Sequence, residues 1–268
     1  MTAVASAPVT ASGASSASSP SPPSPARGPR LLERGTVRHD EVRAQRWVVH
    51  GIAKVLGSAE VGVGELDGTV AVGGAFAADQ LAVVGALDLR GPLTVTGRFS
   101  THGTFDAGSS VHAGEAFLRG AARVLGELVV EGPLTVRGML RAPSVRCGAL
   151  DLYGTAMIPG AVVATSVDVD LVADSALGTV QCREFRLRGP APNVVQRVLG
   201  QPSLVTVERV DAETARIEAA RVRFVRAREI ILGRGAHVEA VEGRVVRAHA
   251  SSRVGPESWS RPPHGLSR

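Results

Sequence analysis

The sequence predicts an all-β fold: a single-chain parallel β-helix, built as a three-sided solenoid, with a disordered tail at each end. Three observations support this prediction. Glycines recur at every sixth residue through much of the chain, and apolar residues occupy the second and fourth positions after many of them. The composition fits as well, because 31 glycines and 44% hydrophobic residues, with only 3% aromatic residues, indicate a core of small aliphatic side chains in a tightly turned backbone.

The glycine spacing is the first element of the argument. It is six residues within each run and five where one run passes into the next, between Gly103 and Gly108. The longest runs are Gly85, Gly91, Gly97 and Gly103, followed by Gly108, Gly114, Gly120, Gly126, Gly132 and Gly138. A helix with glycine at every sixth position would lose about 1 kcal/mol at each one, so the pattern favours strands with glycine at their corners.

The apolar positions define the repeating unit. After Gly85, Leu87 and Leu89 alternate with polar residues, so their side chains lie on one face of a strand. Each unit is therefore predicted to be a strand of three or four residues with one buried face and a glycine corner. Strands this short are unstable alone, so the units must stack, and three units give a coil of about 17 to 18 residues.

The rhythm also predicts the boundaries along the chain. The predicted segments are a disordered Ala/Ser/Pro-rich tail (1–35), a Gly-punctuated solenoid (36–188), a loop with a short helix (189–203), a continuation of the solenoid (204–254) and an irregular tail (255–268). The short helix is expected over 193–199, where Gly200 and Pro202 would end it.

The two ends of such a rod are candidate assembly surfaces. A β-helix leaves one exposed strand edge at each end, and exposed edges pair with other chains unless they are covered. We predict Arg46–Val49 as the first strand, with Trp47 covering the N-terminal end of the core. Trp47, Val48 and Val49 at one end, and Val245 and Val246 at the other, are the candidates for end-to-end assembly.

The charge of the chain is carried by arginine. The formal net charge is +5, and Lys54 is the only lysine. Acidic residues are interleaved with the arginines, which favours a mixed-charge surface over a nucleic-acid site. The most basic stretch could meet an acidic partner or form an ordinary solvated face, and no aromatic platform for base stacking accompanies it; its residues are Arg221, Arg223, Arg226 and Arg228.

The remaining chemistry is sparse. Cys147 and Cys182 lie in alternating apolar segments, so we interpret them as buried structural thiols. No CxxC or HxxxH spacing exists, and we expect neither a metal nor a cofactor. No segment approaches the ~18 consecutive apolar residues that span a bilayer, and no signal-peptide pattern opens the chain. We therefore expect a cytoplasmic protein that does not insert into membranes.

The Gly-punctuated strands of residues 61–188 carry a family resemblance. With segments such as Gly126-Glu-Leu-Val-Val-Glu-Gly and Ala176-Leu-Gly-Thr-Val between Pro-rich tails, the chain resembles the bacterial bactofilins, or polymer-forming cytoskeletal proteins. The resemblance implies a right-handed β-helix that polymerises end to end without nucleotide and scaffolds client proteins, among them factors of the cell envelope. It also implies a place at the inner face of the membrane, held there through partners, and no small-molecule substrate.

Three alternatives stay open beside this reading. A hexapeptide-type β-helix acyltransferase would use His102 or His112 as its catalytic base. A pectinolytic β-helix would use paired carboxylates, for which Asp168 and Asp170 project to the same side of a strand. The third alternative is a monomeric solenoid that binds a partner along one flat face.

Overall fold

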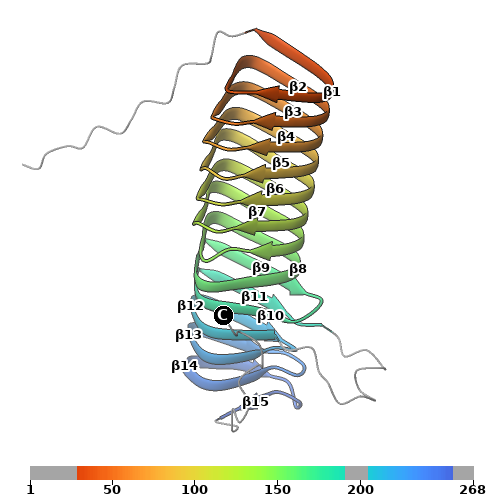
Figure 1. The fold of residues 1–268 in the computed structure, drawn as a ribbon. Coiled ribbons are helices and arrows are strands. Elements are labelled where there is room, and N and C mark those ends of the chain that lie inside the picture. The colour runs from red at the N-terminus through yellow and green to blue at the C-terminus, as the bar shows by residue number, and fades with distance from the viewer. Residues whose placement is uncertain (1–28, 191–204, 256–268) are drawn as a thin grey trace, which may run out of the picture.

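The computed structural model describes residues 29–190 and 205–255, and every regular element in these ranges is a strand. The strands form one sheet with parallel pairing throughout, wound into a rod of about 12 coils (Figure 1). The predicted all-β parallel solenoid is thus confirmed. The helix expected over 193–199 lies outside the described residues.

The strands follow one another along the rod in nearly sequential order. They are β1 (Arg30–His39), β2 (Val42–Val55), β3 (Ala59–Val72), β4 (Phe76–Leu89), β5 (Leu93–Ala107), β6 (Val111–Val124), β7 (Leu128–Arg141), β8 (Val145–Val163), β9 (Ser166–Leu171), β10 (Ser175–Gln181), β11 (Glu184–Arg188), β12 (Val205–Glu218), β13 (Arg221–Leu232), β14 (His237–Ala248) and β15 (Arg253–Val254).

The burial pattern shows the three predicted sides. In the coil of β4, buried pairs occur at Phe76 and Ala78, at Leu81 and Val83, and at Leu87 and Leu89, with exposed or half-buried residues between. Each pair belongs to one side of the coil, and we call these sides A, B and C in chain order. The pair after Gly85 occupies the second and fourth positions after the glycine, as the sequence predicts.

The strands themselves are longer than predicted. β2, β3 and β4 each contain 14 residues and run around all three sides, so the prediction of separate strands of three or four residues is wrong. The reason is that the corners within a coil stay in register with the coils above and below, so the hydrogen-bonded ladder continues through them. The turn between coils interrupts the ladder, and from β4 to β8 its register also shifts at the corner between sides A and B.

Glycine is required at the corner between sides B and C. Gly85 has φ +118°, and a Cβ atom there would lie 2.1 Å from the carbonyl oxygen of Gly68 on the preceding coil. The same contact recurs up the rod, because these glycines are ladder partners of one another; they are Gly35, Gly51, Gly68, Gly85, Gly103, Gly120, Gly138 and Gly154. At the other two corners a Cβ atom also has no room, because at Gly91 and Gly97 it would lie 2.4 and 2.8 Å from carbonyl oxygens of the preceding coil. The six-residue beat therefore has a steric cause at all three corners, and a positive φ at one of them.

The rod begins earlier than predicted. β1 starts at Arg30, inside the segment predicted as a disordered tail, and it pairs along its whole length with β2. Leu31 is the ladder partner of Trp47, and Trp47 is fully buried. Arg46–Val49 is therefore not the first strand and Trp47 does not cover the N-terminal end; both predictions are wrong. Residues 1–28 lie outside the described residues.

The second part of the rod has shorter coils. Val42 pairs with Ala59 and Gly85 with Gly103, which are intervals of 17 and 18 residues. Thr206 pairs with Arg221, an interval of 15 residues. The apolar core nevertheless continues from β2 into β14 as one cluster, so the solenoid extends through β12, β13 and β14.

Candidate functional site

The C-terminal end of the rod presents an unpaired strand edge. One edge of β14 pairs with β13, whereas on the other edge only His237 and Val238 have a partner strand, β15. No strand of the described ranges pairs with the remaining part, Glu239–Ala248, which we call the C-terminal edge. Val245 is the ladder partner of the buried Ile230, yet it is 41% exposed. An apolar core position is thus open at this end.

The N-terminal end carries a charged pair at the corresponding core positions. Glu33 and His39 are the ladder partners of the buried Val49 and Val55, so their side chains continue apolar core columns. The His39 Nε2 atom lies 2.5 Å from Glu33 Oε1, and Trp47 Nε1 donates a hydrogen bond of 2.9 Å to Glu33 Oε2. We call the Glu33–His39 pair the N-terminal cap.

Burial shows that the N-terminal cap belongs to the core rather than to the surface. The Glu33 side chain is only 11% exposed, although β1 is the outermost strand of the described N-terminal end. A buried carboxylate is costly unless it is paired, and here His39 and Trp47 supply the partners. Inward-pointing charges on an edge strand are a known way of preventing edge-to-edge pairing.

The exposed charges at the two ends also differ. β1 carries three exposed arginines, Arg30, Arg34 and Arg38. On β14 the charges divide about a glycine: Glu239 and Glu242 precede Gly243, and Arg244 and Arg247 follow it. Glu239 and Glu242 contact Arg223 and Arg226 of β13 at 3.7 and 3.3 Å, whereas Arg244 and Arg247 are exposed and form no ion pair with the described residues.

The five residues predicted for assembly thus fall in different environments. Trp47 and Val49 are buried beneath β1, and Val48 is half-buried on the outer face of side B. Val245 and Val246 lie on the C-terminal edge and are 41% and 51% exposed. The structure therefore places only the second group at an end of the rod.

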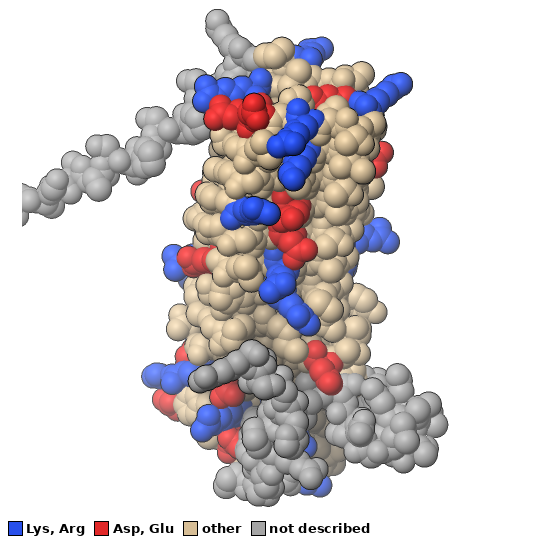
Figure 2. Space-filling view, in the orientation of Figure 1, with Lys and Arg blue, Asp and Glu red and all other residues tan. Residues whose placement is uncertain are grey.

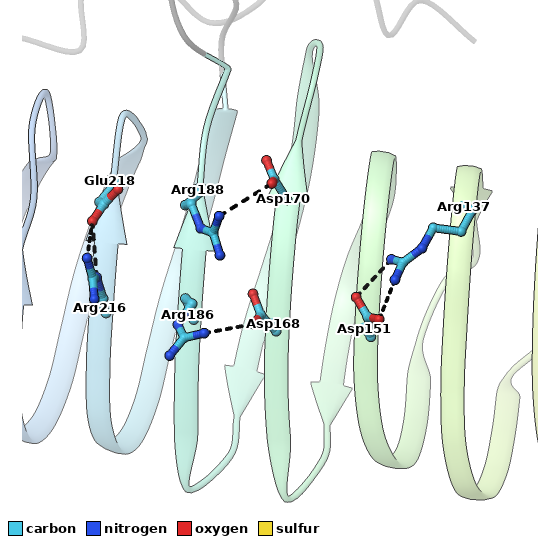
Figure 3. Close-up of polar contacts among 8 residues, drawn as sticks. All are labelled: Arg137, Asp151, Asp168, Asp170, Arg186, Arg188, Arg216 and Glu218. Carbon is cyan, nitrogen blue, oxygen red and sulfur yellow. Dashed lines mark hydrogen bonds and ion pairs between the residues drawn. The ribbon is translucent and has the colours of Figure 1, made fainter.

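Side B carries a ladder of ion pairs over β7 to β12 (Figure 3). Arg137 forms a bidentate ion pair with Asp151. On the following coils, Arg186 lies 3.2 Å from Asp168 and Arg188 lies 3.8 Å from Asp170. Arg216 and Glu218 form an ion pair within β12. The hydrogen bonds that Arg137 donates to Asp151 raise the pKa of Arg137 above its ordinary value. The side chains are 29–54% exposed, so each pair contributes at most about 1 kcal/mol to stability.

This ladder explains the two carboxylates considered for acid–base chemistry. Asp168 and Asp170 each face an arginine of the next coil, from which they accept charge-assisted contacts. Their arrangement is that of a strand surface stabilised across neighbouring coils. On the face shown in Figure 2, charged side chains form a column along the middle of the rod and occur again at its upper end and margins, with uncharged surface between them.

The predicted basic face is not a single face. Arg221 is the ladder partner of His237 on side C, whereas Arg226 is the partner of Glu242 on side A. Arg223 contacts both Glu208 and Glu239, and Arg228 is exposed near the corner between sides A and B. The four arginines are thus spread around the coil, and two of them are neutralised.

The two histidines considered for catalysis lie on different sides. His102 stands at the edge of side B, where its ring is 5.8 Å from that of Phe117, and His112 is exposed on side A. Neither accepts or donates a side-chain hydrogen bond to another described residue. Within residues 29–190 and 205–255, no three His, Cys, Asp or Glu side chains are placed to hold a metal ion.

The two cysteines are isolated thiols. Cys147 is buried and Cys182 is half-buried, and neither forms a disulfide. Burial raises the pKa of each thiol to about 12. They are therefore protonated at neutral pH, which agrees with the structural role predicted for them.

Sequence reasoning missed the N-terminal cap and the charge pattern of β14. Both have a signal in the sequence. Gly35 precedes Gly51 by 16 residues, the same interval that separates Gly138 from Gly154, and this would have placed β1 on the rod. On β14, acidic and basic residues stand at equal distances on either side of Gly243.

Comparison with known proteins identifies no relative: no family model, no curated protein and no solved structure matches the chain.

Proposed function

We propose that the chain is a non-enzymatic structural scaffold, a rod that self-assembles through its ends without nucleotide, as polymer-forming cytoskeletal proteins of the bactofilin type do. The observation that carries this proposal is the C-terminal edge. A row of unpaired backbone groups beside an open core position at Val245 is a template for another strand. A second copy of the chain supplies such a strand.

The chemistry of the sides supports a scaffold over an enzyme. The candidate catalytic groups are dispersed, with His102 and His112 on different sides and Asp168 and Asp170 engaged by arginines. Catalysis requires groups that converge on one reacting atom. A rigid rod of about 12 coils, roughly 60 Å long at the ~4.8 Å spacing of strands, suits the holding of partners at fixed intervals instead.

The partners we propose are further copies of the chain and client proteins bound along the sides, with clients drawn from factors of the cell envelope. No helix of the described ranges could cross a bilayer. We propose a cytoplasmic rod that reaches the inner face of the membrane through its clients.

A monomeric binding module is the second candidate, and one feature favours it. A groove of about 390 Å³ crosses side B and is lined by both acidic and basic side chains, among them Asp168, Arg186, Arg216 and Glu229. Such a groove fits an extended peptide of mixed charge. This reading needs no assembly, so the two candidates differ in solution.

Negative-stain electron microscopy of the full chain, at physiological salt and without nucleotide, separates them. The proposed function predicts particles joined end to end, whose lengths are multiples of about 60 Å. A uniform population of single rods at every concentration would contradict self-assembly and leave the binding module. Addition of ATP or GTP is the matched control, and it is expected to change nothing.

A further inference from the structure

We infer that two copies of the chain join at their C-terminal ends through antiparallel pairing of β14 with β14 of the partner subunit, about a two-fold axis at Gly243. This inference rests on the proposed self-assembly and adds the surface, the register and the symmetry of the contact. Its basis is the sequence of the C-terminal edge as the solenoid places it.

The charges of the edge are complementary to themselves. Glu242 and Arg244 stand one residue before and after Gly243, and Glu239 and Arg247 stand four residues before and after it. Antiparallel pairing about Gly243 sets Glu242 opposite Arg244 of the partner subunit. The register of β14 on β13 shifts between Val245 and Arg247, so the outer pair, Glu239 with Arg247, requires the partner strand to accommodate that bulge. Each glutamate then faces an arginine of the partner subunit, and the two-fold axis makes every contact twice.

The apolar positions obey the same symmetry. Val241 and Val245 stand two residues before and after Gly243, and they are the ladder partners of the buried Val225 and Ile230. Both therefore continue core columns of the rod. In the inferred register Val241 faces Val245 of the partner subunit, so the apolar core continues across the contact.

The shape of the coil permits this register. Gly243 lies at the corner between side A, which holds Val241, and side B, which holds Val245. A two-fold axis through that corner exchanges sides A and B and reverses the strand direction. Gly243 has φ +137°, and a Cβ there would lie 1.7 Å from the Ala227 carbonyl oxygen, so the corner is held in place by glycine.

The charged side chains of β14 favour a second copy of the chain as the partner that pairs with the C-terminal edge. Arg244 and Arg247 are exposed and form no ion pair with the described residues. Glu239 and Glu242 each contact one arginine of β13, and a carboxylate has the lone pairs to accept from a second. Pairing gives Arg244 and Arg247 a carboxylate each, so that Glu239 and Glu242 each lie between an arginine of β13 and an arginine of the partner subunit.

The third side of the coil predicts a bend. β15 adds a layer on side C beyond His237 and Val238, and nothing of the described chain adds one beyond Val241 or Val245. Two rods that meet at sides A and B are therefore wedged apart at side C. We expect their axes to meet at an angle rather than to be collinear.

Sedimentation of full-length single variants tests the inference. Arg244→Glu places two glutamates opposite each other, and Glu242→Arg places two arginines opposite each other. Each variant alone is expected to associate about 10- to 100-fold more weakly than the parent chain. An equimolar mixture of the two variants restores complementary pairs and is expected to associate within about threefold of the parent chain. Arg119→Glu, the same charge reversal at an exposed arginine of β6 in the middle of the rod, is the matched control and is expected to change nothing.

The outcomes separate the inference from the proposed function. Monomers of the parent chain at every concentration would overturn both. A parent chain that assembles while Arg244→Glu assembles equally well, or a mixture of variants that fails to restore pairing although each melts like the parent chain, would overturn the inference alone. Hydrogen exchange identifies the occupant of the edge. Protection of the amides of 239–248 that rises with protein concentration supports a second copy, and protection that is complete in the monomer overturns it.

Discussion

The two ends of the rod share one fold and differ in what fills the last core positions. At the N-terminal end, Glu33 and His39 occupy columns that are valine in the next coil, and they pair with each other. At the C-terminal end, Val245 occupies such a column and is exposed. The difference teaches that the repeat builds the rod, whereas a few residues distinguish its two ends.

A polymer built from such a rod would have two unequal contacts. The C-terminal edge is apolar at its core positions and complementary in charge. The N-terminal edge holds a charged pair and the exposed Arg30, Arg34 and Arg38, which repel a second copy of themselves. We expect pairs joined at their C-terminal ends to form first, with longer particles dependent on the weaker N-terminal contact.

The largest effect is expected from a substitution that disrupts the contact between two C-terminal ends. Val245→Asp places an unpaired carboxylate at the continued core, twice in each pair, and should weaken association by on the order of 100-fold or more. Leu32→Asp is the matched change at the other end, where Leu32 is 64% exposed on the outer face of β1. Sedimentation should show no change for Leu32→Asp. Equal losses for both variants would contradict the distinction between the ends.

The second prediction compares two of the glycines at the corner between sides B and C, one in the outermost coil and one in the interior of the rod. Gly85→Ala forces a Cβ atom to 2.1 Å from the Gly68 carbonyl oxygen and should destabilise the fold by about 3 kcal/mol or more. Gly35 also has a positive φ, +84°, but a Cβ there meets no atom within 4 Å. Gly35→Ala should therefore cost only about 1 to 2 kcal/mol. Chemical denaturation measures both, and a Gly35→Ala loss as large as that of Gly85→Ala would show that another layer covers the N-terminal end.

Removing the N-terminal cap should make the ends more alike. The double substitution Glu33→Val and His39→Val extends the core columns of Val49 and Val55 into β1, which leaves the N-terminal end open to stacking. We expect longer end-to-end particles in electron micrographs. We also expect the single rod to lose about 1 to 3 kcal/mol, because Trp47 Nε1 loses its hydrogen-bond acceptor. Particles no longer than those of the parent chain would contradict a blocking role for the cap.

The smallest effect concerns the thiols. Burial raises the pKa of Cys147 and Cys182 to about 12, from 9.0 when exposed. The unfolded chain therefore loses these protons first, so their contribution to stability is complete below pH 9 and declines as the pH rises toward 12. Both thiols should resist alkylation at pH 8 until the chain unfolds. Rapid labelling of the native protein would contradict their burial.

The rod was predictable because its causes are local and repeated. The glycine beat reflects a steric contact that recurs in every coil, and the apolar pairs that follow it reflect the same buried columns. The ends were not predictable in this way. Glu33 and His39 interrupt the apolar alternation of β1, so the strand appeared to be part of a polar tail, and Trp47 appeared to be terminal. Their role appears only when the register with β2 sets them above Val49 and Val55.

The prediction of a single basic face was wrong for a related reason. Arg221, Arg223, Arg226 and Arg228 are close in sequence, but a coil of 15 or 16 residues turns them toward different sides. Their closeness in the sequence therefore suggested a denser positive patch than the folded chain presents on any one side. The charge pattern about Gly243 is also a sequence pattern, yet it acquires meaning only because no strand within residues 29–190 and 205–255 pairs with this edge of β14.

The most direct test of the unequal ends is to image the paired particle with one end marked. Biotin attached at residue 38 of β1, with streptavidin bound to it, marks the N-terminal end in negative-stain images of the full chain. We predict bent particles with two arms of about 60 Å each and a marker at the outer end of each arm. Particles with both markers at the centre would show that the N-terminal ends join, and would contradict the account.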